Sequence, residues 1–366
     1  MKHWRACPAL SPTRYYRTAW ALLAQCRAFA VALVIPAVLA TPAVAQKITI
    51  AIVPSVPGGT TYVALDKGYF RDAGLDVDIE RIDSLGKAVA FLATNHVQVA
   101  QGGINAGFYN AVAQGLPVAL ALESGSSPTY HQIVVRTDLK DRIHTPAELK
   151  GRTVGLSSPG STSMYEVASV LAAAKLTLKD VTPKNLAFSQ MAAALANGAL
   201  DAAMEVAPFT ERIIEQKIAV PWIDPDDYIR PQPMSSVGYI VNTDWARQNP
   251  DAAKKLFVAL ARAGRDYCQA YHHGSNRGEI IDIFLKYRIG TDRDLLDRMA
   301  WQARNVNGEF NIASILDMQA FFQREGIIQK TSPADKLVDP RYAAEVEKEL
   351  GPFHLTNTAS PLKGCR

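Results

Sequence analysis

Short runs of aliphatic and β-branched residues alternate with amphipathic helical stretches over residues 47–240, and the chain beyond residue 249 has an almost wholly helical pattern. Each apolar run has the length of a buried strand and is followed by glycine or small polar residues. This alternation predicts an α/β protein with mainly parallel, helix-covered sheets. We predict strands at 48–53, 77–82, 97–101, 118–122, 133–136, 153–156, 186–188, 202–205 and 237–241. We predict helices at 60–70, 87–94, 104–114, 163–175, 190–197 and 251–271.

Two apolar strand segments, HQIVVRT at 131–137 and VGYIVN at 237–242, enclose a compact middle block. A block that is entered and left through neighbouring strands predicts two lobes joined by a paired hinge. We assign residues 46–136 and 237–366 to the first lobe, the latter part mostly helical with a C-terminal tail. Residues 137–236 form the second lobe.

The first 45 residues have the pattern of a secretory signal peptide. Five cations and no acidic residue precede or flank an uncharged run at 28–40, and Ala43-Val44-Ala45 follows it. The run is shorter than the roughly 20 residues of a membrane-spanning helix, which favours a cleaved signal over a retained anchor. We expect cleavage after Ala45.

The charge balance changes once this leader is set aside. The whole chain has 39 Lys and Arg against 35 Asp and Glu, a net charge of +4. Five of those cations lie in the leader, so 34 remain against 35 acids and the net charge from Gln46 onward is near −1. A nearly neutral protein has no electrostatic basis for binding nucleic acid or a membrane surface.

Export would leave two cysteines, Cys268 and Cys365, in an oxidising compartment. They either form a disulfide that anchors the C-terminal tail or stay as two free thiols, and the sequence leaves both alternatives open. Free-thiol titration of denatured, unreduced protein distinguishes them.

Signatures of catalysis and metal binding are sparse. The chain contains no CxxC, HExxH, GxSxG or phosphate-binding glycine motif. His272 and His273 are adjacent, and neighbours in a helix point about 100° apart, which disfavours a shared metal. We therefore expect no metal, no cofactor and no catalytic residue.

Small polar and glycine-rich turns follow several predicted strands, at the strand ends where open α/β sheets bind ligands. They lie at 54–62, 83–86, 101–105 and 157–163. In the last turn, hydroxyl groups stand at a predicted helix N-terminus, which suits a sulfonate or carboxylate. The alternative is a simple capping box formed by Ser163 and Glu166. The similar pattern at Thr145 and Glu148 favours a capping box alone.

Ligand-binding candidates come from these turns and from one strand end. They are Thr61, Tyr62, Ser84, Asn105, Ser161, Thr162, Ser163 and Glu205. Tyr62, Tyr109 and Tyr130 could cover an apolar part of a ligand, or else lie in the core. Glu205 ends a strand, where a buried carboxylate needs a donor such as a ligand amine or ring N–H. A solvated or internally paired glutamate is the alternative.

Several motifs resemble those of the periplasmic solute-binding proteins of sulfonate, taurine, nitrate and thiamine-pyrimidine importers, the NMT1/THI5-like group. They are ALDKGYF at 64–70 with AGLDV at 73–77, AELKGRTVG at 147–155, and GALDAA at 198–203. One departure is Gln98, an amide where the family commonly has an acid.

The resemblance implies a two-lobed type II periplasmic-binding-protein fold with two hinge strands. It further implies a periplasmic monomer that closes on a small organic anion and delivers it to the permease and ATPase of an ABC importer. The alternatives are an enzyme on the same fold, similar to the pyrimidine synthase or chorismate dehydratase and using Glu205 or His131 as a base, or a binding protein that feeds a sensor. The exported leader and the absence of a cysteine cluster speak against the enzyme.

Overall fold

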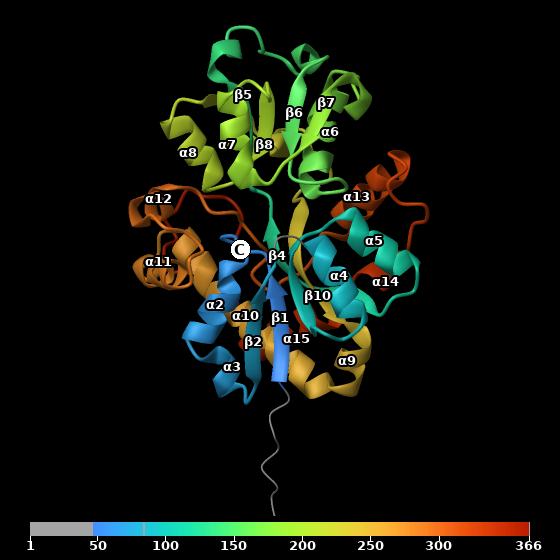
Figure 1. Cartoon of the computed structure of the whole chain (residues 1–366). Coiled ribbons are helices and arrows are strands. Elements are labelled where there is room, and N and C mark those ends of the chain that lie inside the picture. The colour runs from blue at the N-terminus through green and yellow to red at the C-terminus, as the bar shows by residue number, and fades with distance from the viewer. Residues whose placement is uncertain (1–46, 83–84, 366) are drawn as a thin grey trace, which may run out of the picture. The chain divides into compact units, whose positions relative to one another are not determined.

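The structure is a computed structural model that describes residues 47–82 and 85–365, without the side chains of residues 86 and 87 (Figure 1). The predicted signal peptide and the candidate Ser84 lie outside the described residues. Two five-stranded sheets, each with its own helices, form the described chain.

The first sheet has the strand order β2-β1-β3-β10-β4. Its strands are β1 (Lys47–Ile52), β2 (Asp76–Arg81), β3 (Val99–Gly103), β4 (Val118–Ser126) and β10 (Ser235–Asn242). Strand β1 is parallel to β2 and β3, whereas β10 is antiparallel to β3 and β4. Four of the five strands therefore share one direction, and their carboxyl ends share one edge.

The second sheet has the order β7-β6-β8-β5-β9. Its strands are β5 (Gln132–Arg136), β6 (Thr153–Leu156), β7 (Thr182–Asn185), β8 (Ala202–Glu205) and β9 (Ala219–Ile223). Strand β6 is parallel to β7 and β8, and β5 is antiparallel to β8 and β9. Each sheet thus has one reversed strand, which confirms the predicted α/β class with mainly parallel sheets.

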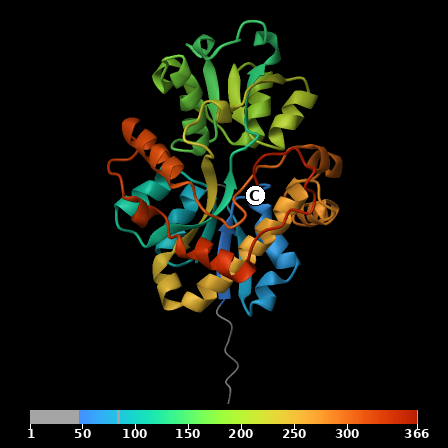
Figure 2. The same ribbon diagram turned by 180° about the vertical axis from the view of Figure 1, so that it is seen from behind.

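Helices cover both sheets, and the C-terminal helices return to the first one (Figures 1 and 2). The α-helices before β10 are α2 (Gly59–Asp66), α3 (Tyr69–Asp72), α4 (Leu85–Ala93), α5 (Ala106–Ala113), α6 (Thr162–Ala173), α7 (Phe188–Ala196) and α8 (Phe209–Glu215). Those after it are α9 (Thr243–Gln248), α10 (Pro250–Tyr271), α11 (Arg277–Lys286), α12 (Arg293–Arg298), α13 (Ile312–Arg324), α14 (Ala334–Leu337) and α15 (Arg341–Leu350). Short 3-10 helices are η2 (Thr137–Leu139), η3 (Pro146–Leu149), η4 (Leu178–Asp180) and η5 (Pro225–Asp227).

The first sheet separates two hydrophobic clusters, because side chains alternate between the faces of a strand. Ile48, Ile50 and Ile52 of β1 join a cluster with α2, α10 and α11, while Ala51 faces the other side. The cluster on that other side continues into the second sheet, where it includes Val154 and Met204. The two sheets of the described chain therefore share buried apolar contacts.

Strand β4 ends the first sheet and is nevertheless buried along its whole length. Residues after α12 cover it: the amide of Ser126 donates to Ala303 O at 2.8 Å, and the amide of Glu123 donates to Gly308 O at 2.8 Å. This contact brings the segment 302–308 to the carboxyl end of the sheet, although it lies far along the chain.

Two crossover segments, 127–131 and 224–234, connect the sheets, and one carboxylate joins them. The Ser127 hydroxyl donates to Asp226 Oδ1 at 2.6 Å, and the Thr129 amide and hydroxyl donate to Asp226 Oδ2 at 2.6 and 3.0 Å. The paired connection has the form of the predicted hinge. It departs from the predicted boundary, because β5 pairs within the second sheet, so the chain changes sheet before Gln132 and not after Arg136.

Two predictions of local structure were wrong, and one strand was missed. The helix predicted at 60–70 is divided into α2 and α3 by Gly68, whose φ is +74°. The strand predicted at 186–188 lies instead at β7, an exposed edge strand of sequence TPKN that carries no apolar signal. Strand β9 was missed because Pro221 interrupts its pattern, which an edge strand tolerates.

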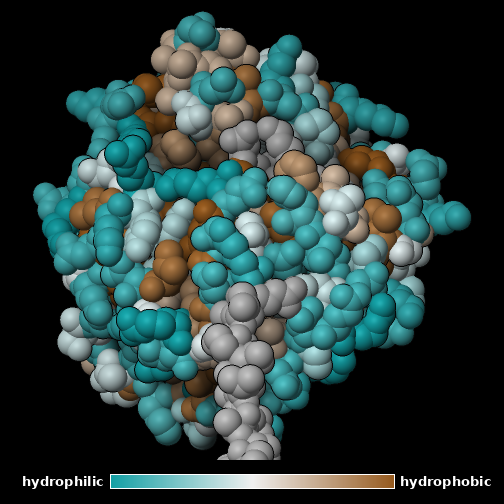
Figure 3. Space-filling model, turned by 60° about the horizontal axis from the view of Figure 1, so that its bottom comes forward, coloured by the Kyte–Doolittle hydropathy of each residue, from teal (hydrophilic) through white to brown (hydrophobic). Residues whose placement is uncertain are grey.

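The structure bonds Cys268 to Cys365, which decides between the two alternatives for these cysteines. Over residues 47–82 and 85–365, no helix has the length and apolar character needed to span a membrane. The face drawn in Figure 3 is largely hydrophilic, with hydrophobic residues in separate small areas.

Candidate functional site

The turns that follow β3 and β6 meet across the two sheets. The Ala106 amide donates to Gly160 O at 2.9 Å, and the Thr162 hydroxyl donates to Ile104 O at 2.9 Å. The approach is close, because a Cβ added at Gly160 would lie 2.7 Å from Ala106 Cβ. The carboxyl ends of the two sheets therefore face each other, as the positions of the predicted turns require.

The candidate Asn105 lies at this meeting point as the N-cap of α5. Its side-chain oxygen accepts from the Phe108 amide at 3.2 Å, and its amide group donates to Gly103 O at 3.2 Å. These bonds fix the turn next to the α6 N-terminus. They also occupy part of the side chain that we predicted to contact a ligand.

The three candidate hydroxyl residues of α6 lie together, and protein groups already bond to each of them. Ser161 is the N-cap residue, and its Oγ donates to Ser158 O at 2.7 Å. Ser163 Oγ lies 2.8 Å from Ser161 Oγ and accepts from the Ser157 amide at 3.0 Å. Ligand binding through these hydroxyls stays a prediction, and it would require some of these bonds to be exchanged.

The capping box considered for Ser163 and Glu166 does not form, because Ser161 occupies the N-cap position, without a side-chain capping bond, and Glu166 bonds elsewhere. Glu166 is fully buried, and its Oε1 lies 2.7 Å from Nδ1 of His131 instead. Burial would lower the pKa of His131, but the Glu166 carboxylate raises it, and the net shift is upward. The capping box predicted for Thr145 and Glu148 is confirmed.

Glu205 is the most unusual group of the site. Its side chain is fully buried at the end of β8, and neither carboxylate oxygen has a hydrogen-bond partner among the described residues. Burial raises the pKa of Glu205 to about 8. Other buried carboxylates have partners: Glu123 accepts from the Asn305 amide and from the Ser235 hydroxyl, each at 2.7 Å.

Thr61, Tyr62 and Tyr109 lie in the protein interior. Thr61 is buried, with its hydroxyl 2.9 Å from that of Tyr239. Tyr62 stacks on Tyr287 with ring centroids 4.5 Å apart, and it belongs to the hydrophobic core. Tyr109 is fully buried and donates to a backbone carbonyl of α13, while the hydroxyl of Tyr130 pairs with that of Tyr271. Tyr62 and Tyr109 are therefore core residues, whereas Tyr130 is half-buried in the crossover after β4 and its role as a ligand wall stays a prediction.

Two polar residues under the turn at 54–62, Gln101 and Arg304, are not among the candidates predicted from the sequence. Gln101 is fully buried in β3, and its Oε1 has no partner among the described residues. Its position, a polar side chain at the end of an apolar strand, was a usable signal. Arg304 binds the turn from a segment about 240 residues away, and no local pattern marks it.

In the part of the chain that the structure describes, neither a metal-binding group nor the large cavity includes the candidate residues. Among residues 47–82 and 85–365, no group of three or more His, Cys, Asp or Glu side chains could hold a metal. A cavity of about 1020 Å³ is lined by Val118, Thr243 and Arg341, at the opposite edge of the first sheet. It contains none of the candidates, so the residues at the facing strand ends remain the best site.

Comparison with known sequences decides the family. The profile described as NMT1/THI5 like matches residues 59–271, which run from α2 through the second sheet to the end of α10. The chain belongs to the NMT1/THI5-like family. No curated protein sequence matches it.

Solved structures show that this NMT1/THI5-like chain has the periplasmic-binding-protein fold. The alkanesulfonate-binding protein SsuA of Xanthomonas axonopodis pv. citri, bound to MOPS, is 16% identical with a TM-score of 0.64, covering 80% of this chain and 97% of its own. The nitrate-binding protein NrtA of Synechocystis PCC 6803 is 16% identical with a TM-score of 0.67, covering 84% and 89%. A cysteine-to-serine variant of DszB in complex with biphenyl-2-sulfinic acid is also 16% identical, with a TM-score of 0.55, covering 82% and 99%.

Proposed function

We propose that this protein is a periplasmic substrate-binding protein of an ABC importer. It captures a small organic anion of the sulfonate, taurine or aromatic carboxylate type and delivers it to an inner-membrane permease and its ATPase. Support comes from the family, from the signal-peptide pattern and from the names of the structural neighbours, which include alkanesulfonate- and nitrate-binding proteins.

The observation that carries this proposal is the meeting of two strand-end turns across the sheets. The bonds from Ala106 to Gly160 and from Thr162 to Ile104 join the lobes beside the N-termini of α5 and α6. Backbone N–H groups at a helix N-terminus favour a bound anion. A ligand held there contacts both lobes, and it favours the closed state only by its greater affinity for that state.

Glu205 gives the site a second kind of contact. With a pKa of about 8, the carboxyl group is mostly protonated at neutral pH, so it does not repel an anion and can donate a hydrogen bond. A ligand amine or ring N–H would instead draw the proton away and pair with the carboxylate. Measuring the protons released on binding, by calorimetry in buffers of different ionisation enthalpy, distinguishes the two ligand types.

An enzyme on the same fold is the second candidate, and the His131–Glu166 pair is the observation that favours it. A histidine held by a buried carboxylate is a familiar general base. Despite burial, the Glu166 carboxylate raises the pKa of His131, which makes the imidazole a stronger base. Recovery of a bound ligand unchanged after long incubation would reject the enzyme.

A sensor that receives the protein in place of a permease is the third candidate. It shares the ligand site with the transport proposal and differs only in the partner. Copurification of the ligand-loaded protein with permease subunits supports transport, whereas specific binding to a histidine-kinase ectodomain supports sensing.

The test of the site uses the double variant Thr162→Ala, Ser163→Ala, titrated calorimetrically with alkanesulfonate and benzoate. Loss of two hydroxyls at the lobe contact is expected to weaken binding about tenfold or more, since each hydrogen bond contributes about 1 kcal/mol. The matched control is Thr145→Ala, Thr177→Ala, which removes two capping hydroxyls elsewhere in the second lobe. Unchanged affinity in a folded Thr162→Ala, Ser163→Ala protein would reject the anion site at α6.

A further inference from the structure

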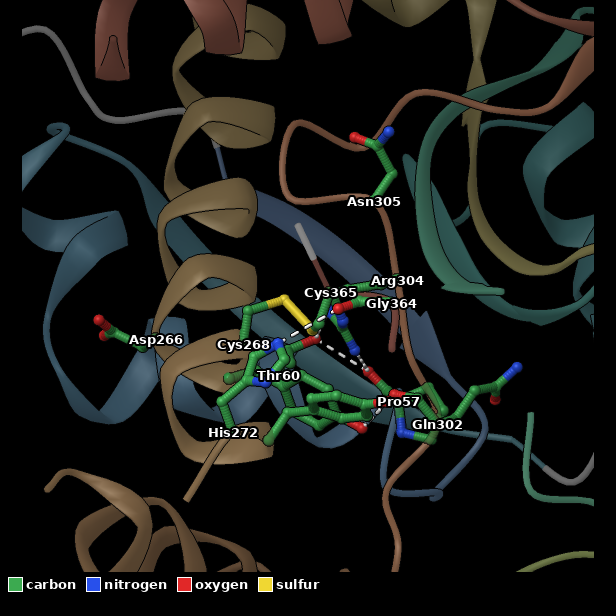
Figure 4. Close-up of a disulfide and its surroundings, with 12 residues drawn as sticks. Pro57, Thr60, Asp266, Cys268, His272, Gln302, Arg304, Asn305, Gly364 and Cys365 are labelled. Carbon is green, nitrogen blue, oxygen red and sulfur yellow. Dashed lines mark hydrogen bonds between the residues drawn. A yellow bond between two sulfur atoms is a disulfide. The ribbon is translucent and has the colours of Figure 1, made fainter. Parts of the chain in front are cut away.

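A buried arginine supports the first turn of the site from beneath. Arg304 is 4% exposed, and its guanidinium donates to Pro57 O and to Thr60 Oγ1, each at 3.2 Å. Figure 4 shows the guanidinium directed at these two residues, beside the Cys268–Cys365 disulfide. Both acceptors belong to the turn that joins β1 to α2.

The charge of Arg304 is not neutralised by a direct ion pair in the part of the chain that the structure describes. Its other contact is the face of Tyr267, with the guanidinium carbon 4.1 Å from the ring centroid. Its Nε–H has no hydrogen-bond partner among the described residues. The Glu123 carboxylate acts on Arg304 through its charge, but its oxygens are bonded to Asn305 and Ser235. Burial lowers the pKa of Arg304.

Arg277 offers a direct contrast within the same chain. It is also buried, and it also lies over an aromatic ring, 4.3 Å from the centroid of Trp301. It differs in forming an ion pair with Asp297 at 2.9 Å. Arg304 and Arg277 are thus alike in burial and stacking, and only Arg304 lacks the neutralising carboxylate.

Neighbouring contacts fix the backbone of Arg304. The preceding residue, Ala303, is bonded to β4 through its carbonyl and to Pro128 O through its amide, at 2.8 and 2.9 Å. On the other side, a Cβ added at Gly364 would lie 2.6 Å from Ala303 Cβ, so the disulfide-anchored tail packs directly on this segment. The guanidinium therefore stays under the turn.

We propose that Arg304 is a positioning and specificity-determining residue: from beneath the turn at 57–60 it supplies the positive charge by which the first lobe selects an anionic ligand. This inference rests on the proposed function, since it assumes that the ligand lies above that turn. Arg304 acts through the turn, whose carbonyl and hydroxyl oxygens it binds, and it does not need to touch the ligand. In general, at an effective dielectric constant of about 20, a unit positive charge about 8 Å from an anion contributes about 2 kcal/mol, or roughly thirtyfold in affinity over a neutral ligand.

The test compares charged and uncharged ligands of similar shape. Wild type, Arg304→Gln, Arg304→Lys and the control Arg277→Gln are titrated with hexanesulfonate and benzoate, and with the neutral hexanesulfonamide and benzamide. Arg304→Gln is expected to weaken binding of the anions about tenfold to thirtyfold more than binding of the amides. Arg304→Lys keeps the charge and should retain most of the anion preference, which also covers the case that Arg304→Gln does not fold.

Arg277→Gln is expected to lower thermal stability and leave the ratio of anion to amide affinity unchanged. Suppose that wild type binds the anions, but Arg304→Gln and Arg304→Lys change the affinities for anions and amides by the same factor. Arg304 is then only structural, and this inference fails while the proposed function stands. If wild type prefers the neutral amides or binds no anion of this panel, the anion selectivity and the inference fail together.

Discussion

Replacing Glu205 with glutamine should stabilise the protein, by an amount that grows with pH. The wild-type carboxyl has its pKa raised by burial from 4.5 to about 8, whereas glutamine keeps nearly the same shape and never ionises. The unfolded wild-type chain releases its proton near pH 4.5, but the folded chain holds it until about pH 8. Wild type therefore loses stability as pH rises between these values, and it loses no more above them.

The magnitude follows from the size of this shift. At 1.36 kcal/mol per pKa unit, the interval between 4.5 and about 8 sets an upper limit near 5 kcal/mol. The Glu205→Gln advantage should be about 1 kcal/mol at pH 5, about 3 kcal/mol at pH 7 and about 4 kcal/mol at pH 8. With an unfolding entropy of roughly 0.7 kcal/mol per degree for a chain of this size, the pH 7 value raises Tm by about 4 °C.

The assay is urea or thermal unfolding of ligand-free wild type and Glu205→Gln between pH 5 and 8. The matched control is Glu325→Gln, which makes the same chemical change at an exposed position after α13. Because that side chain is exposed, its replacement should change stability far less than Glu205→Gln does at pH 7 and above. A Glu205→Gln advantage of equal size at pH 5 and pH 8 would refute the claim that burial keeps this carboxyl neutral.

Three further outcomes follow from the structure. Reduction of the Cys268–Cys365 disulfide, which spans 97 residues, should lower the free energy of unfolding by about 4 kcal/mol in urea titrations. In unreduced denatured protein, neither of these two cysteines should react as a free thiol. Gly308→Ala should lower the free energy of unfolding by more than about 2 kcal/mol, because φ is +76° and the new Cβ would lie 2.2 Å from Leu122 of β4. The control Gly326→Ala has a similar φ of +71° but open space around the new Cβ, so it should lower the free energy of unfolding by only about 1 kcal/mol. Asp226→Asn should lower Tm by several degrees, because it weakens the hydrogen bonds that join the two crossovers; an unchanged Tm would contradict that role.

Strands with a local apolar signal were predictable from sequence. The runs at 153–156 and 202–205 match β6 and β8 at both ends, because these central strands are short, mostly apolar and mostly buried. The edge strands of the second sheet were not predictable in this way, because β7 is exposed and polar and β9 contains Pro221. The apolar helix pattern also continued through Gly68, where only the backbone dihedral marks the division.

The candidate site was predictable only where sequence neighbours form it. Clustering of Ser161, Thr162 and Ser163 at a helix start follows from their adjacency, and the position of Glu205 follows from a recognisable strand end. Arg304 reaches the first turn through the pairing of a distant segment with β4, which no local pattern encodes. The tyrosines show the same limit, because their apolar rings suit a core and a ligand wall equally well.

The central claim, capture of a small organic anion, is tested most directly by a thermal-shift screen of residues 46–366 after refolding to remove carried-over ligand. The panel contains an alkanesulfonate, taurine, nitrate, an aromatic carboxylate and a pyrimidine. A ligand at 100 times its Kd stabilises the folded state by about 2.7 kcal/mol, which here corresponds to about 4 °C. We expect this increase for one class of organic anion. No response from any anion, or a response only to the uncharged pyrimidine, would contradict it.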